Sequence, residues 1–456
     1  MATIETLSPQ LAQEIEALRP EFEQALKEIV EIPTVSMDPA CNDAMRQGAE
    51  WALRFLDALG CEAMLYETEG FPVVVGTLRH PRATRTLTIY NHLDVQPANE
   101  PEWQTEPFVF TKQDDVYRGR GTTDDKGPAL AAYFAAKLAK RHDIPLNLQF
   151  VWEFEEEIGS PNFEAFLEAH KADLETDSVL VSDTIWISRD KPAAPLGLRG
   201  LVGFRLLLET GTKDVHSGLA GGAARNPIGE LCQLISEIYD ARTGQVKIPG
   251  FYDTARPVTE AERASFVASG FDPEHFKAAH GLKCLRVTDP ADITERIWAK
   301  PTFEVHGMVG GYTGPGIKAI VPPRAEAKVS MRLVPDMQPQ EIFEKVEAFV
   351  KEHAPDVVLE REGALEPYMG SSEGPYAAAI KSSLRFGFGA DPAFVREGGS
   401  IGAVVSMQRQ LGCPIMFIGL SLPEHGYHAP NEHFDWGMAR GGMMAFMRYF
   451  EQVAAL

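Results

Sequence analysis

Residues 119–154 read GRGTTDDKGPALAAYFAAKLAKRHDIPLNLQFVWEF, and this stretch decides the fold class. A glycine-rich turn with two aspartates leads into an apolar stretch, residues 130–138, that has little β-branching and predicts a helix. Apolar side chains then alternate from Leu146 to Phe154, which is the period of a strand. A helix followed closely by a strand is typical of a sheet layered between helices, so the stretch indicates an α/β fold.

The same alternation continues on both sides of this stretch. Helical periodicity covers residues 50–59, and short apolar strands are expected at 86–90 and 178–181. Near the C-terminus, residues 377–386 predict another helix and residues 414–420 another strand. This pattern predicts a central mixed sheet between helices.

The middle of the chain has a different pattern of predicted strands and helices. Strands are expected at 201–210, 302–306 and 324–334, and helices at 226–240 and 340–352. A chain of 456 residues also exceeds the about 50–250 residues of a single domain. We therefore predict an α/β domain made of residues 1–200 and 373–456, interrupted by an α+β domain at residues 201–372.

The net charge and the cysteine content limit which binding partners and which cellular location the sequence predicts. A net charge of −22 argues against nucleic acid and anionic membranes as partners, because both would repel the chain. The five cysteines are odd in number and widely spaced, so no disulfide framework is predicted. The first residues lack the basic start and apolar run of a signal peptide, and no stretch reaches the roughly 18 apolar residues of a membrane helix. We expect a cytoplasmic protein.

Acidic residues and histidines cluster just after the predicted strands or just before a helix. They are His92, Asp94, Asp124, Asp125, Glu155, Glu156, Glu157, Asp183, His425 and His428. In open α/β sheets the ligand site lies beyond the carboxyl ends of the strands. Five separate segments are therefore expected to converge on one place.

These residue types have the chemistry of a metal centre. Histidine and carboxylate ligands suit zinc or manganese, and two histidines with several carboxylates are too many for one tetrahedral ion. They suit two ions about 3.5–4 Å apart that share a carboxylate. Burying several carboxylates together also requires compensating cations.

Each of these residues also has an ordinary structural explanation. Asp124 and Asp125 can cap the following helix, a run of glutamates is usually a solvated surface, and His428 can be a plain loop residue. Taken singly, these explanations are favoured. Taken together they require five independent coincidences, so the metal centre is favoured for the set.

Ten motifs, in order along the chain, form a more specific pattern. They are NHLDVQP (91–97), GRGTTDDKG (119–127), EFEEEIGS (153–160), VSDTIW (181–186), GLRG (197–200), KDVHSG (213–218), GGYTGPG (310–316), MRLVPDM (331–337), REGGSIG (396–402) and HAPNE (428–432). With these motifs the chain resembles the M20 metallopeptidase family, and most closely its cytosolic nonspecific dipeptidase and carnosinase branch. The resemblance implies an enzyme that hydrolyses dipeptides or similar short amides with a metal-bound water.

The resemblance implies a role for each metal-type residue. His92 and Asp183 resemble ligands of a first metal ion, and Glu157 and His428 resemble ligands of a second. Asp124 resembles the carboxylate that bridges the two ions, and its peptide bond to the next residue is typically cis in this family. Two divalent ions per subunit are therefore expected, with Zn2+ or Mn2+ left open.

The catalytic and substrate-binding roles follow from the same resemblance. Glu156 resembles the general base, and Asp94 resembles the partner that orients the first histidine ligand. His216, in the predicted insert, resembles a residue that stabilises the oxyanion in the active site of the opposite subunit. Arg332 and Ser400 resemble the groups that hold the free carboxylate of the substrate. The insert is thus expected to be a lid and dimerisation domain of a homodimer that cleaves small peptides.

Some positions match no family role or depart from the pattern. The spacing to the following Ile-Gly-Ser leaves Glu155 out as the base, and His425 is interpreted as a loop residue. Asn91 stands where the branch more often has glycine, and Ala319 where close relatives often have threonine near the substrate. Residues 366–376 also lack a histidine found in some relatives, so carnosine is not predicted as the substrate.

Two other functions are alternatives at this stage. An N-acyl amino acid deacylase could use the same metal centre, since it also cleaves an amide beside a carboxylate. The long insert and the GLRG and KDVHSG motifs favour the dipeptidase. A binding or scaffold protein without activity predicts the loss of a ligand or of the base, and none is lost here.

Overall fold

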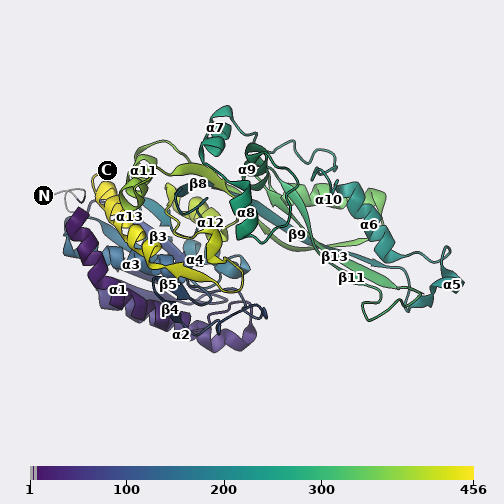
Figure 1. Cartoon of the computed structure of the whole chain (residues 1–456), viewed down its shortest axis with the longest axis horizontal. Coiled ribbons are helices and arrows are strands. Elements are labelled where there is room, and N and C mark those ends of the chain that lie inside the picture. The colour runs from purple at the N-terminus through teal and green to yellow at the C-terminus, as the bar shows by residue number, and fades with distance from the viewer. Residues whose placement is uncertain (1–3, 5–7) are drawn as a thin grey trace.

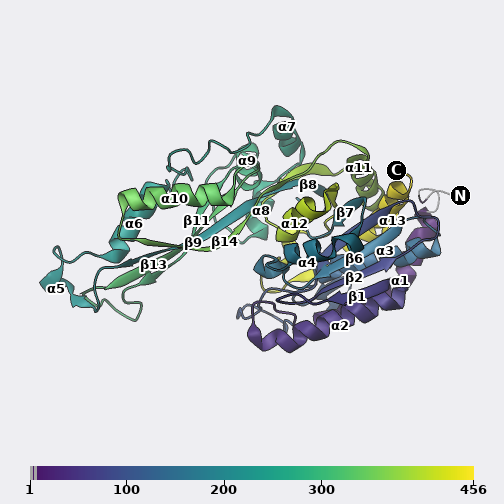
Figure 2. The same cartoon turned by 180° about the vertical axis from the view of Figure 1, so that it is seen from behind.

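The computed structural model describes residue 4 and residues 8–456, and these form two units of unequal width (Figure 1). The larger unit holds both ends of the described chain, and the narrower unit projects from one side of it (Figure 2). Residues 1–3 and 5–7, at the beginning of the predicted α/β domain, lie outside the described residues. The helices are α1 (Ser8–Val30), α2 (Asn42–Leu59), α3 (Lys126–Arg141), α4 (Phe163–His170), α5 (Ser217–Ala220), α6 (Pro227–Ile238), α7 (Glu260–Ala268), α8 (Pro273–Ala279), α9 (Pro290–Trp298), α10 (Pro339–His353), α11 (Pro375–Phe388), α12 (Gly402–Leu411) and α13 (Trp436–Ala454).

A six-stranded mixed sheet forms the centre of the larger unit. In the order of the sheet, its strands are β1 (Glu62–Tyr66), β2 (Val73–Leu78), β6 (Asn147–Glu153), β3 (Thr86–His92), β7 (Ser178–Val181) and β17 (Ile415–Phe417). The last four pair in parallel, whereas β2 pairs antiparallel with both β1 and β6. The predicted α/β class with a central mixed sheet is confirmed.

Helices cover both faces of this sheet. Phe150 and Trp152 of β6 are fully buried in a core shared with α1, α2, α3 and α13. The residue between them, Val151, points to the opposite face and packs with side chains of α4 and α12. Successive strand residues alternate between faces, so the apolar run of β6 is buried on both sides. The parallel strands are therefore held in fixed register, and their carboxyl ends form one rigid edge.

Two small sheets complete the larger unit, and neither was predicted. One consists of β15 (Tyr368–Met369), β8 (Ala193–Leu198) and β16 (Ala393–Glu397). The other consists of β18 (His433–Asp435), β5 (Val116–Arg118) and β4 (Thr111–Gln113). Each small sheet joins strands from distant parts of the sequence, β8 with β16 and β5 with β18, and its strands are only two to six residues long, so a local apolar pattern could not identify them.

The narrower unit is built on a four-stranded antiparallel sheet. Its strands, in order, are β11 (Thr302–Gly310), β13 (Arg324–Leu333), β9 (Gly200–Glu209) and β14 (Val358–Leu365). Helices α6 and α10 bury their apolar sides against one face of this sheet, where Phe204 and Met331 lie in the core. A short ribbon of β10 (Val215–His216) and β12 (Ile320–Val321) lies near the tip, where Figure 1 shows α5.

Part of the predicted insert packs on the larger unit. Phe266 of α7 and Trp298 of α9 are buried in the core cluster of the larger unit, and their rings meet edge to face at 5.1 Å. The segment that contains α7, α8 and α9 thus fills the junction between the units (Figures 1 and 2). The boundaries at residues 200 and 372 stay a prediction. Within the described residues, no helix is long and apolar enough to cross a membrane.

Candidate metal centre

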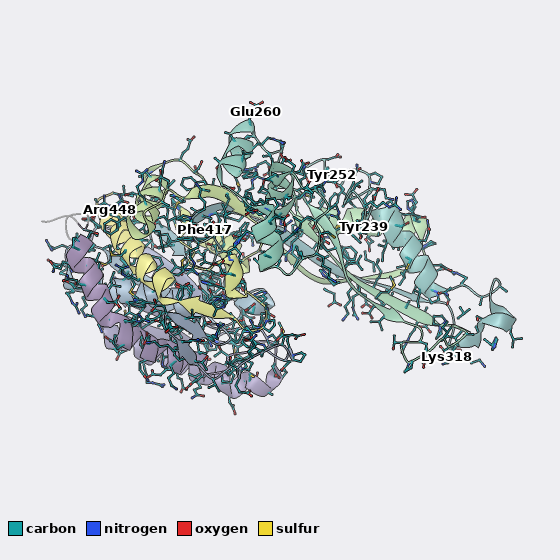
Figure 3. All side chains as sticks on the ribbon, in the orientation of Figure 1. Tyr239, Tyr252, Glu260, Lys318, Phe417 and Arg448 are labelled. Atoms are coloured by element: carbon teal, nitrogen blue, oxygen red, sulfur yellow. The ribbon has the colours of Figure 1, made fainter. Side chains whose placement is uncertain are left out.

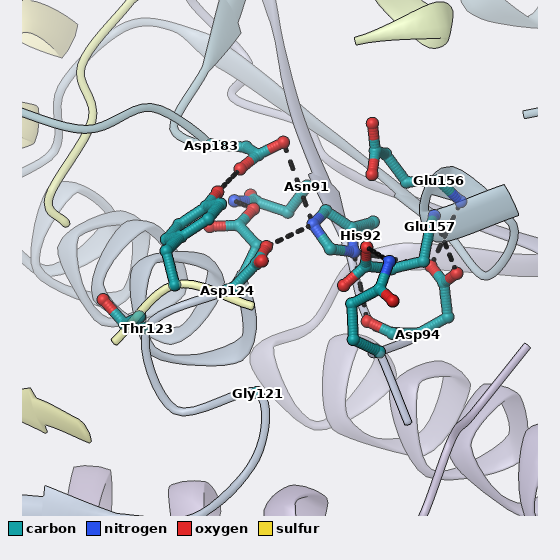
Figure 4. Close-up of polar contacts among 12 residues, drawn as sticks. Asn91, His92, Asp94, Gly121, Thr123, Asp124, Glu156, Glu157 and Asp183 are labelled. Atoms are coloured by element: carbon teal, nitrogen blue, oxygen red, sulfur yellow. Dashed lines mark hydrogen bonds and ion pairs between the residues drawn. The ribbon is translucent and has the colours of Figure 1, made fainter. Parts of the chain in front are cut away.

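The six residues predicted as metal ligands or base come together at the carboxyl edge of the central sheet. His92 ends β3, Glu156 and Glu157 follow β6, and Asp183 follows β7. Figure 4 shows these side chains gathered near Asp124, whose turn precedes α3. The sixth residue, His428, lies in the loop between β17 and β18. The parallel strands thus place their polar ends where open α/β sheets bind ligands.

Asp124 lies between two imidazoles. Its Oδ1 is 3.1 Å from Nε2 of His92, and its Oδ2 is 2.9 Å from Nε2 of His428. Asp183 Oδ2 lies 3.8 Å from the same His92 nitrogen, and Glu157 Oε2 lies 3.2 Å from the His428 nitrogen. Two ligands that each lie 2.0–2.2 Å from one tetrahedral ion are roughly 3.3–3.6 Å apart. The four separations here, from 2.9 to 3.8 Å, lie on both sides of that range, so small side-chain shifts would let these atoms share ions.

The donor atoms form two groups that can each hold a metal ion. His92, Glu156 and Asp183 offer atoms within 4.8 Å of one another, and so do Asp124, Glu157 and His428. The first group includes Glu156, the predicted base, at ligand distance. Its carboxylate is therefore adjacent to whatever the first group binds, which is where a base for a bound water has to be.

The raised pKa values of carboxyl groups in these two sets also indicate sites for cations. Burial raises the pKa of Glu157 to about 7, and the charge of Asp124 adds to the shift. Burial likewise raises the pKa of Glu156 well above its usual range and raises that of Asp183. Adjacent buried carboxylates disfavour one another's ionised form, and positive ions between them reverse this effect. The chemistry of the donor set and its burial thus fit two divalent ions.

Asp94 contacts both sides of the centre. The Nδ1 atom of His92 lies 3.1 Å from the backbone oxygen of Asp94 and 3.4 Å from its Oδ1. The two carboxylate oxygens of Asp94 accept the backbone N–H groups of Glu156 at 3.2 Å and Glu157 at 3.0 Å. One buried carboxylate therefore holds the His92 ring and the turn that carries both glutamates.

The loop that carries Asp124 is anchored by Glu432, a residue to which the sequence analysis gave no role. The fully buried Glu432 carboxylate accepts the backbone N–H groups of Gly121 at 2.8 Å, Thr123 at 2.9 Å and Asp124 at 3.1 Å. It also accepts Nη1 of Arg120 at 2.9 Å. Glu432 ends the HAPNE motif, so the motif contained the signal, but only the fold shows the contacts.

The local backbone explains the residue types in the TTDDKG turn. The Asp124–Asp125 peptide bond is cis, as the family resemblance implied. A side chain at Gly127 would place its Cβ 2.2 Å from the backbone oxygen of Thr122, so only glycine allows α3 to begin there. The turn therefore presents Asp124 to the centre while the helix starts immediately behind it.

Neighbouring polar residues have structural partners. The carboxylate of Glu155 accepts the backbone N–H of Phe71 at 3.0 Å and the amide of Asn162 at 2.9 Å, so it is engaged outside the two metal groups. His425 is fully buried and lies 2.9 Å from the hydroxyl of Thr123, which makes it part of the support of the Asp124 loop. The hydroxyl of Tyr427 donates to Asp183, a contact that the sequence analysis missed.

Arg332 and Ser400 meet at the junction of the two units. Nη1 of Arg332 donates to the hydroxyl of Ser400 at 3.0 Å, and that hydroxyl donates to the backbone oxygen of Arg199. Burial lowers the pKa of Arg199 to about 10, and the nearby charge of Arg332 adds to the shift. Among the described residues, neither arginine forms an ion pair with a carboxylate. Arg199 belongs to the GLRG motif, but no role for it was predicted from the sequence.

A further carboxyl group, Glu397, lies within electrostatic range of both the metal groups and the arginine pair. Burial raises its pKa to about 7, and it lies within electrostatic range of both Asp183 and Arg199. It stands three residues before Ser400 in the REGGSIG motif, which was quoted without a role for it. One acidic group, Glu397, and one basic group, Arg199, therefore influence each other near the metal groups.

His216 is not brought to the centre by its own chain. It is exposed, lies in β10 and caps α5, since its Nδ1 accepts the backbone N–H of Gly218 at 2.9 Å. Figures 1 and 2 show α5 at the tip of the narrower unit, at the opposite end of the molecule from the central sheet. Within one chain, the predicted oxyanion residue is therefore remote from the other site residues.

Known proteins are similar to this chain in both sequence and fold. Residues 88–452 match the model of the peptidase family M20/M25/M40. The Cys-Gly metallodipeptidase dug1 of Schizosaccharomyces pombe is 31% identical, over 98% of each chain. The human Beta-Ala-His dipeptidase is also 31% identical, over 84% of this chain and 78% of its own.

A solved structure agrees with these sequence matches. The M20 family metallo-carboxypeptidase Sso-CP2 from Sulfolobus solfataricus has a TM-score of 0.89 and 32% identity, covering 96% of this chain and all of its own (100%). The two dipeptidase relatives do not favour the deacylase alternative, and the resemblance drawn from the motifs is confirmed. The chain belongs to the peptidase family M20/M25/M40, and it is a metallopeptidase.

Proposed function

We propose that the protein is a dinuclear dipeptidase that hydrolyses dipeptides or similar short amides with a free carboxylate. The observation that carries this proposal is the position of Asp124, whose two oxygens face the imidazoles of His92 and His428. His92 and Asp183 would complete one metal site, and Glu157 and His428 the other. Mixed nitrogen and oxygen ligands suit Zn2+ or Mn2+.

The roles of the chain's own residues follow from their positions. When bound, the two divalent ions supply Lewis acidity that lowers the pKa of a water and polarises the scissile carbonyl. Glu156 accepts a proton from that water and passes it to the leaving amine. Asp94 fixes the backbone of Glu156 and thereby its distance from the substrate. His92, Asp124 and Asp183 are buried, whereas His428 is exposed, so the centre is open to solvent on the His428 side.

The arginine pair supports recognition of the substrate carboxylate. Burial and the charge of Arg332 lower the pKa of Arg199, and among the described residues neither arginine forms an ion pair, although Glu304 and Glu397 lie within electrostatic range of Arg199. A carboxylate between them relieves this repulsion, and the fork of a guanidinium binds a carboxylate through two hydrogen bonds. Ser400, already bonded to Arg332, offers a further contact.

Replacing Arg332 with lysine should weaken recognition of the free carboxylate. The charge stays but the fork is lost, and a hydrogen bond to a charged group is worth about 1.5–3 kcal/mol, so kcat/KM should fall roughly 10–100-fold. The measurement compares a dipeptide with its C-terminal amide, and the variant should lose most of the discrimination between them. Arg324→Lys, at the exposed start of the same strand, is the matched control. Unchanged discrimination in Arg332→Lys would contradict the assignment.

We also propose a homodimer formed through the narrower unit. Its tip exposes large apolar side chains that no part of the described chain covers, among them Leu219, Val309 and Ile317, which are 89%, 65% and 99% exposed. Lys318, which pairs with Asp214 at 2.7 Å, marks the same tip in Figure 3. The position of His216 at this tip supports its predicted action in the site of the opposite subunit.

A mixture of two inactive variants tests the shared site. His216→Ala removes the group that acts across the interface, and Glu156→Gln removes the base. In a heterodimer of the two, one site receives an intact base and an intact His216, so activity should return to a fraction of the wild-type value. Verified heterodimers that stay inactive, or a fully active monomer, would rule out the shared site. Mixing either variant with itself is the control.

A substrate panel tests the reaction itself. Cys-Gly and β-Ala-His are the first dipeptides to assay, because they name the two relatives compared above. N-acetyl amino acids in the same panel cover the deacylase, and activity confined to them would replace the dipeptidase assignment. The cytoplasmic location stays a prediction, and the five free cysteines of the structure are compatible with it.

A further inference from the structure

A polar cavity, separate from the metal centre, lies where the narrower unit joins the larger one. It has a volume of about 260 Å³ and lies between the end of α9, the start of β11 and the loop before Tyr252. Tyr252 is labelled in Figure 3 and marks the region. None of the residues assigned above to the metals or to the substrate lines it. Its volume is just below the about 300–1,000 Å³ of sites for drug-sized ligands, so it suits a small molecule.

The lining is dominated by positive charge. Three cationic side chains, Arg286, Arg296 and Lys300, face the cavity, and Glu304 is the single acidic residue in its lining. Such a cluster is unusual in a chain with a net charge of −22. Like charges brought together in this way repel one another unless an anion lies between them.

The two arginines have unused hydrogen-bonding capacity. Arg296 donates to the backbone oxygen of Thr243 at 2.9 Å, while its buried Nε has no partner. Among the described residues, Arg286 donates one side-chain hydrogen bond, to the backbone oxygen of Ala241 at 3.4 Å. Within residues 8–456, neither arginine is paired with a carboxylate. Lys300 differs, since it pairs with Glu295 at 2.9 Å.

The geometry holds the two guanidinium groups side by side. Both flank Gly244, where a Cβ would lie 2.6 Å from Nη1 of Arg286 and 3.5 Å from Nη1 of Arg296. Gly244 has a φ of +78°, a conformation that suits glycine, so the loop can bring its backbone close to both groups. Planar guanidinium forks on two sides of a small cavity match the oxygens of a phosphate or carboxylate.

We infer that this cavity is a binding site for a small multivalent oxyanion of the phosphate or carboxylate type, held by Arg286 and Arg296. The site is separate from the catalytic centre and does not depend on the proposed reaction. It adjoins the start of β11, whose Thr302 pairs with Arg332 of β13, so the bound anion lies one strand away from the proposed carboxylate site.

Two measurements on the metal-loaded protein test the site. Crystals soaked in selenate should show an anomalous selenium peak between Arg286 and Arg296. Calorimetric titration with phosphate, pyrophosphate and citrate, against chloride at equal ionic strength, should show binding that weakens about 10-fold or more in Arg286→Gln, because a charge-assisted contact is lost. Phosphate without citrate binding would identify the phosphate type, and the reverse the carboxylate type.

The control removes the same charge from the same region. Arg242→Gln alters an exposed arginine two residues before Gly244 that does not line the cavity, and it should bind the anions as the wild type does. Arg286 is itself exposed, so its replacement leaves the core intact. Selenium peaks confined to the metal centre or to Arg332, or equal anion binding by wild type and Arg286→Gln, would overturn the inference.

Discussion

Replacing Glu156 with glutamine should lower kcat by about 10²–10⁴-fold, the usual contribution of general acid–base catalysis, while the metal content stays at two ions. Glutamine has nearly the shape of glutamate but cannot accept the proton of the attacking water. The backbone contact between Glu156 and Asp94 does not involve the side chain and should persist. The measurement combines kcat on a dipeptide with metal analysis of the same sample.

The neighbouring glutamate provides the matched control for this variant. Oε1 of Glu155 accepts both the Phe71 N–H at 3.0 Å and the Asn162 amide at 3.1 Å, so the single side-chain oxygen of a glutamine can still accept both. Glu155→Gln should therefore keep a kcat near that of the wild type. The reverse result, with Glu155→Gln inactive and Glu156→Gln active, would move the base by one residue and reject the assignment.

Asp124→Asn should disrupt both metal sites at once and reduce kcat/KM by at least ~10³-fold, because bound ions provide several kcal/mol of transition-state stabilisation. One oxygen of Asp124 faces His92 and the other faces His428. Asparagine keeps a single oxygen and turns an NH2 group toward the other imidazole, and the shared negative charge is lost. Metal analysis after dialysis should find fewer than two ions per chain.

An aspartate outside the site serves as the control for this change. Asp57 is exposed on α2, and Asp57→Asn should retain two ions and full activity. A variant at Asp124 that still bound two ions and kept activity near the wild-type level would show that another group bridges the metals. His428→Ala, which touches one group only, should instead lose one ion in preference to the other.

Much of the candidate metal centre could be predicted because parallel strands impose a simple geometry. His92, Glu156, Glu157 and Asp183 all stand at the carboxyl ends of strands that local apolar patterns identify. Once the strands are placed in one sheet, these residues have to be neighbours. Asp124 and His428 lie in loops, and their roles came from the family resemblance instead.

The supporting residues could not be predicted from local pattern. Glu432 bonds to a loop more than 300 residues earlier in the chain, at Gly121 and Thr123, and no periodicity encodes such a contact. The same holds for the small sheet of β8, β15 and β16, whose strands are too short and distant to show a period. Helices α7 to α9 were not predicted because they are short, with seven to nine residues each, and the apolar Phe266 of α7 and Trp298 of α9 pack against the other unit.

The position of His216 shows a different limit of prediction from the sequence. The KDVHSG motif indicated a functional histidine, yet the fold places it at the tip of the narrower unit, away from its own chain's centre (Figures 1 and 2). If a residue acts in the active site of a second copy of the chain, the groups that it contacts cannot be identified from one sequence or from one subunit. The prediction of a shared site therefore rests on the motif and on the exposed apolar tip together.

The central claim is that Asp124 bridges two divalent ions, and anomalous diffraction tests it most directly. Crystals grown with zinc and measured on both sides of the zinc edge locate each ion independently of any activity assay. We expect two peaks about 3.5–4 Å apart, one beside His92 and Asp183, the other beside Glu157 and His428, with Asp124 in contact with both. A single peak, or two peaks of which neither touches Asp124, would contradict it.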